Sequence, residues 1–61
     1  MYIKLINCTN TANIYGLYND ENRIIGTCEM VLAGREAGKS FYASWSHHTN
    51  REIKKLFRKY A

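Results

Sequence analysis

Hydrophobic and polar positions alternate with a period of two in residues 24–32, where the even positions are Ile24, Gly26, Cys28, Met30 and Leu32. This alternation predicts a strand that buries its even face. Residues 2–7 are predicted to form a first strand and residues 13–18 another. The polar run Asn19-Asp20-Glu21-Asn22 follows and suits a hairpin turn.

The end of the chain has the period of a helix. Thr49 and Glu52 form an S/T-x-x-E capping box, so the helix is expected to begin at Asn50. Its apolar stripe, at i, i+3, i+4 and i+7, is Ile53, Leu56, Phe57 and Tyr60. Because so short a helix is marginal in water, the stripe is expected to dock on the sheet.

Residues 41–46 fit two patterns. As a strand they would turn Phe41, Ala43 and Trp45 inward and Tyr42, Ser44 and Ser46 outward. As a helix they would add Tyr42, Trp45 and Thr49 to the apolar stripe. Weak helix formers follow, and a cap at Thr49 implies a fresh start there, so the strand is favoured. The expected fold is α+β: a small antiparallel sheet of three to four strands with one C-terminal amphipathic helix packed on a face, in one domain over residues 1–61.

Composition narrows the class of protein. The 61 residues are 46% hydrophobic, but no apolar run is long enough to span a membrane. The N-terminus lacks the features of a secretory signal, so a cytoplasmic location, of a host cell if the protein is viral, is expected. Cys8 and Cys28 are expected to be reduced, half-buried small hydrophobes, with a disulfide between neighbouring strands as the alternative.

Charge is distributed unevenly along the chain. Residues 1–48 carry four cations and four anions, whereas residues 49–61 carry five cations and Glu52. The whole net charge of +4 therefore lies in the last thirteen residues. The five cations form an arc opposite the apolar stripe: Arg51, Lys54, Lys55, Arg58 and Lys59.

The segment Ala33-Gly34-Arg35-Glu36-Ala37-Gly38-Lys39-Ser40 differs by one residue from the phosphate-loop pattern G-x-x-x-x-G-K-[ST]. A phosphate loop, however, leads from a strand into a helix inside a parallel sheet, for which this chain is too short. The only Asp, Asp20, lies upstream in a turn. The segment is therefore predicted to be a hairpin loop in which Gly34 and Gly38 take positive φ. Arg35, Lys39 and backbone N–H groups there could still meet an anion.

Other chemistry is weakly represented. His47 and His48 are adjacent rather than three to five residues apart, so no metal site with Cys8 and Cys28 is expected. Cys28 and His47 as nucleophile and base lack a well-placed orienting group. The sequence accordingly predicts neither catalytic residues nor a cofactor. Lys39 to Trp45 is loosely similar to the strand motif of RNA-recognition domains, and Tyr42 could stack on a base or simply pack the sheet.

The order of strand, two hairpins and capped helix resembles small phage-encoded anti-CRISPR inhibitors, particularly of the type I-F group. The likeness covers most of the chain at the level of architecture, including residues 13–20, the glycine loop and residues 49–60. It implies a non-enzymatic protein that binds a CRISPR effector complex and blocks its hold on nucleic acid. Many such inhibitors are acidic mimics of nucleic acid, whereas this chain is basic. The layout also resembles the arm-binding domains of phage-type integrases, which insert a sheet into the major groove.

Two functions are therefore expected as alternatives, beside a merely solvated basic helix face. In the first, the basic face and exposed tyrosines dock on an acidic protein surface of a nucleic-acid-handling complex. In the second, the same cations with Arg35 and Lys39 bind DNA or RNA phosphates directly. A membrane-surface helix is disfavoured because the stripe closes the core. An exposed edge strand would also allow a homodimer.

Overall fold

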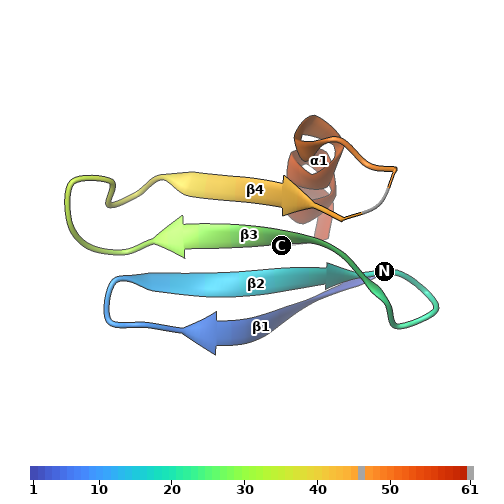
Figure 1. Cartoon of the computed structure of the whole chain (residues 1–61), viewed down its shortest axis with the longest axis horizontal. Helices are drawn as coiled ribbons and strands as arrows, with labels where there is room; N and C mark the ends of the chain where they lie inside the picture. The colour runs from blue at the N-terminus through green and yellow to red at the C-terminus, as the bar shows by residue number, and fades with distance from the viewer. Residues whose placement is uncertain (46, 61) are drawn as a thin grey trace.

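The computed structural model describes residues 1–45 and 47–60 and contains four strands followed by one helix (Figure 1). The elements are β1 (Tyr2–Cys8), β2 (Ala12–Tyr18), β3 (Ile24–Val31), β4 (Ser40–Ser44) and α1 (Asn50–Tyr60). The strands form one antiparallel sheet in the order β1-β2-β3-β4, and α1 packs on one face, mostly against β4 and β3. The α+β prediction is confirmed, with four strands.

The core lies between α1 and the sheet. Leu17, Ile25 and Cys28 from the strands meet Ile53 and Phe57 from the helix, and all five side chains are buried. Of the predicted stripe, Leu56 is half-buried, but Tyr60 is 42% exposed in the last turn, so its expected burial is wrong.

The helix begins where the capping box predicts. The N–H of Thr49 donates to Glu52 Oε2 at 2.7 Å, and the N–H of Glu52 donates to Thr49 Oγ1 at 3.2 Å. Two N–H groups that the first turn leaves without helical partners are thereby satisfied. The cap fixes the start of α1 at Asn50 and hence the direction in which its cations point.

A bulge changes which side chains of β3 are buried. Leu17 pairs with Gly26 and Tyr18 with Ile24, which leaves Ile25 as an extra residue that enters the core. Ile24 instead lies on the opposite face, beside Gly16. The prediction of a buried even face is therefore correct for Gly26 and Cys28 but wrong for Ile24. It is also wrong for the exposed residues further along, Met30 and Leu32.

Residues 41–44 are a strand, which confirms the favoured interpretation, and Ser46 lies outside the described residues. The expected orientation is wrong, however. Tyr42 pairs with the buried Cys28 and its ring centroid lies 6.0 Å from that of Phe57, so Tyr42 faces the helix. Phe41 and Trp45 are 46% and 59% exposed. Both alternating sets contain aromatics, so hydrophobicity alone does not identify the inner face; the pairing of Tyr42 with Cys28 does.

Both cysteines are free thiols, with Cys28 buried and Cys8 exposed. The alternative of a disulfide is therefore wrong, as is the expected half-burial of both thiols, because Cys8 is exposed and Cys28 is buried. Cys8 is the last residue of β1, an edge strand in which six of seven residues are exposed. No helix in the described part of the chain has the length and apolarity to cross a bilayer.

Candidate functional site

The five cations of α1 form one exposed surface, here called the cationic face. The helix buries Ile53 and Phe57 against the sheet and directs the opposite arc into solvent. All five side chains on that arc are exposed: Arg51, Lys54, Lys55, Arg58 and Lys59. The structure thus brings together the helical part of the predicted site.

None of these cations is neutralised by a carboxylate among the described residues. The two ion pairs there join the Met1 ammonium to Asp20, at 2.7 Å, and Arg23 to Glu21, at 3.8 Å. Glu52, the acidic residue of α1, accepts the N–H of Thr49 in the cap. Lys59 Nζ lies 5.4 Å from the ring centroid of Tyr60. The cationic face is therefore available to an external anion.

Arg35 and Lys39 lie in the loop 32–39 between β3 and β4, away from the cap of α1 (Figure 1). Gly34 and Gly38 have φ of 94° and 87°, as the hairpin prediction requires. The structure does not place these two cations on the cationic face.

Five backbone N–H groups of the loop already have acceptors within the protein. The N–H of Ala37 donates to Gly34 O, that of Gly38 to Val31 O at 2.9 Å, and that of Lys39 to Glu36 O at 3.0 Å. At the start of the loop, the N–H groups of Leu32 and Ala33 both donate to Thr11 O. A phosphate loop turns such N–H groups toward the ligand, whereas here they hold the hairpin together.

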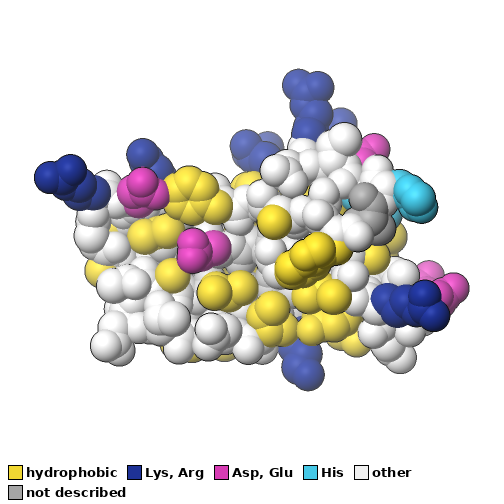
Figure 2. All heavy atoms as spheres, viewed as in Figure 1, with side chains coloured by type: hydrophobic (Ala, Val, Ile, Leu, Met, Phe, Trp, Pro, Cys, Tyr) yellow, Lys and Arg dark blue, Asp and Glu magenta, His cyan; other side chains and the backbone are white. Residues whose placement is uncertain are grey.

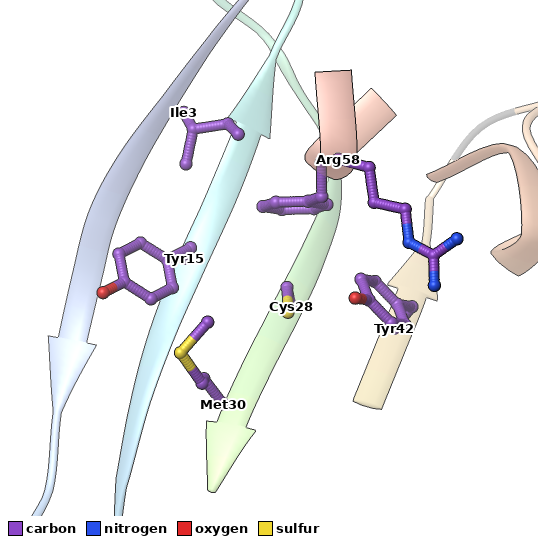
Figure 3. A pocket seen from close by; sticks show the side chains of 7 residues that line it. Ile3, Tyr15, Cys28, Met30, Tyr42 and Arg58 are labelled. Atoms are coloured by element: carbon purple, nitrogen blue, oxygen red, sulfur yellow. The ribbon is translucent and has the colours of Figure 1, made fainter. Parts of the chain in front are cut away.

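Tyr42 is not the exposed stacking residue that the sequence suggested. With Tyr15 and Cys28 it forms a row across β2, β3 and β4, in which Tyr15 pairs with Cys28 and Cys28 with Tyr42. This row is part of the lining of a cleft of about 360 Å³ beside α1 (Figure 3). The other lining residues are Ile3, Met30, Phe57 and Arg58.

Arg58 belongs to both features. Its side chain extends from α1 past Tyr42, so that the guanidinium lies at the side of an otherwise apolar and aromatic cleft (Figure 3). The cleft has the size and lining of small ligand sites. A ligand with an apolar part in the cleft would bind more tightly if it also carried an anionic group beside the Arg58 guanidinium.

Cys28 is the thiol that lines the cleft. Burial raises the pKa of its thiol above the ordinary value of 9.0, and hydrogen bonding with Tyr42 and Ser40 acts in the opposite direction. The thiol is therefore protonated at neutral pH, which makes it a poor nucleophile. The cleft is lined by no histidine, and the described residues contain no group of three His, Cys, Asp or Glu that could hold a metal ion.

Sequence reasoning missed the second face of the sheet, which α1 does not cover. A Cβ on Gly16 would point toward Ile6, Tyr18 and Ile24, whereas a Cβ on Gly26 would meet Ile53, so the two glycines mark opposite faces. Gly16 pairs with Lys4 and Thr27, and the next row joins Ile14, Glu29 and Phe41. The sequence signal for this face was the apolar residues at alternate positions, Phe41, Ala43 and Trp45. The sequence pattern predicted that these side chains point into the core.

Comparison with known proteins adds no relative to this description. No protein-family model, no curated protein and no solved structure matches the chain.

Proposed function

We propose that this chain is a non-enzymatic binding protein that docks through its cationic face on an acidic surface of a nucleic-acid-handling complex. The observation that supports this proposal is the cationic face itself: five exposed cations on one side of an eleven-residue helix, without a carboxylate partner in the described chain.

The packing of α1 gives the cations a defined arrangement. Ile53 and Phe57 are buried to 5% exposure or less, so the helix cannot rotate about its axis without breaking the core. Cations held in this way steer an acidic partner during encounter and fix its orientation once bound. The resemblance to type I-F inhibitors makes a CRISPR effector complex the first such partner to test.

Direct binding of DNA or RNA is the second candidate, favoured by the same unpaired cations. Neutralising several phosphates would release counterions and give affinity that falls steeply with salt. The cations can contact base edges as well as phosphates, and Glu52 can contact base edges, but α1 has one amide side chain, Asn50, of the kind that reads adenine. Protein docking is therefore preferred.

Fluorescence anisotropy with labelled single- and double-stranded DNA and RNA separates the two candidates. If the chain docks on a protein, it should show no salt-sensitive binding to free nucleic acid. It should instead prevent an added effector complex from binding DNA. Direct binding predicts salt-sensitive micromolar affinity without any other protein, and this result would overturn the docking proposal.

Two variants locate the surface in either assay. The first variant should abolish binding and keep a high helix propensity, because it replaces four cations together by Ala: Lys54, Lys55, Arg58 and Lys59. The matched control replaces Arg35 and Lys39 by Ala, which removes charge from the loop and should leave binding intact. Equal loss in both variants would mean that net charge, rather than the cationic face, is responsible.

A further inference from the structure

The face of the sheet opposite α1, here called the open face, is an exposed apolar surface. Hydrophobic side chains gather across it, and Lys and Arg side chains lie around its edge (Figure 2). Tyr2 and Tyr18 stack on it with ring centroids 5.0 Å apart and an interplanar angle of 9°. The large hydrophobic side chains on it that are more than 40% exposed are Tyr2, Ile6 and Phe41, and Trp45, 59% exposed just after β4, continues the alternation of Phe41 and Ala43.

Exposed aromatic side chains grouped on one face of a sheet mark a candidate interaction site. Soluble monomers rarely expose contiguous apolar patches beyond a few hundred square ångströms, and larger patches mark interaction sites. In this chain the one described helix covers the other face, and Phe41 and Trp45 remain 46% and 59% exposed. A domain of this size also has a small core, which association commonly supplements.

The charges of the open face identify a partner. Its strand residues include one cation, Lys4 on β1, and one anion, Glu29 on β3, with β2 between them. Neither has an ion-pair partner among the described residues. The charges near the β2–β3 turn are already paired, Met1 with Asp20 and Arg23 with Glu21. The strands therefore bring one cation and one anion to this face, on β1 and β3, which lie on either side of β2.

We propose that the open face binds the open face of a second copy of this chain. In a two-fold dimer every contact occurs twice: if one residue of the first copy contacts a second residue of the partner, that second residue in the first copy contacts the first residue of the partner. An axis between the two sheets that crosses β2 near Tyr15 places each Lys4 over the partner's Glu29. Both pairs form at once, while the aromatic side chains are buried between the sheets. Gly16, which has no side chain, leaves room at the centre of the face.

A nucleic acid fits this face less well than a second copy does. Strand-binding sheets combine stacking aromatics with a cationic groove for the backbone, whereas here Glu29 offsets the charge of Lys4. Face-to-face pairing leaves both edge strands free and turns the two cationic faces outward, on opposite sides of the dimer. Dimerisation and the proposed docking function are thus independent.

Sedimentation velocity over a range of protein concentrations tests the proposal, with Trp45, the single tryptophan, as a second probe. We expect a monomer–dimer equilibrium in which the emission of Trp45 shifts to shorter wavelength as dimer forms. Glu29→Lys or Lys4→Glu alone should each weaken the dimer at least about tenfold, because like charges then face one another. The double variant Lys4→Glu/Glu29→Lys should restore it, since each pair is re-formed with reversed sign.

Glu36→Lys makes the same change of charge in the β3–β4 loop and should leave association unchanged. Circular dichroism checks that each variant is folded. A protein that stays monomeric at the highest concentration overturns the proposal, as does a dimer that is insensitive to both single reversals. A shift of Trp45 emission that occurs only on addition of nucleic acid would also overturn it.

Discussion

Ile53 occupies the space that a side chain at Gly26 would need. A Cβ built on residue 26 would lie 2.6 Å from Ile53 Cδ1 and 2.9 Å from the carbonyl oxygen of Ala43. The helix can approach the sheet this closely only because β3 has a glycine at that position, so the depth of the core depends on this pair.

Gly26→Ala is therefore expected to lower the free energy of unfolding by about 1–3 kcal/mol, as overpacking of a core does. Thermal and urea unfolding measure the change. Adding Ile53→Val, which removes Cδ1, should recover part of the loss. Gly16→Ala is the control, because its nearest neighbours are movable side-chain ends, those of Ile24 and Tyr18 at 3.0 Å. An unchanged melting curve for Gly26→Ala would contradict the packing described.

Thr49→Ala should destabilise the protein by about 1 kcal/mol, because the N–H of Glu52 loses its acceptor. The expected result is a lower midpoint of unfolding with little change in the helical signal at low temperature. Asn50→Ala is the matched control in the neighbouring position and should be close to neutral. If both variants unfold alike, the reciprocal cap does not contribute to stability.

Cys8 should react with iodoacetamide much faster than Cys28 in the folded protein. Cys28 is 3% exposed and its raised pKa keeps it protonated at pH values where an ordinary thiol ionises. Because the folded-state pKa is the higher one, this thiol contributes stability below the unfolded pKa and loses it as pH rises through the folded value. Mass-resolved labelling between neutral and alkaline pH measures both rates, and denaturant should equalise them. Equal rates in the folded protein would refute the buried assignment.

Ala33→Gly completes the strict phosphate-loop pattern but should not create a nucleotide site. The N–H groups of Ala37, Gly38 and Lys39 remain bonded within the hairpin, and no helix follows Ser40. Titration with Mg-ATP should give no saturable binding to either the variant or the parent chain. Saturable binding that requires Lys39 would restore the nucleotide hypothesis.

The elements were predictable from the sequence because local rules specify them. The cap at Thr49 and the stripe of Ile53 and Phe57 locate the helix, and Gly34 and Gly38 mark the loop as a turn. These signals depend on neighbouring residues, so they also placed the cationic face correctly.

The faces of the sheet were less predictable, because they depend on pairing between distant residues. The extra residue Ile25 shifts the alternation within β3, and no pattern within residues 24–32 reveals this bulge. Whether Phe41 or Tyr42 points inward is decided by the register of β4 on Cys28. The open face was missed for the same reason, since its exposed aromatics look like core residues in the sequence.

The order of the strands has a consequence for how the chain acquires its structure. Since every strand pairs with its neighbour in sequence, the contacts of the sheet are short-range and can form early during synthesis. The helix residues that complete the core, Ile53 and Phe57, are synthesised after all four strands. The core is therefore complete only after α1 has been synthesised and has docked on the sheet.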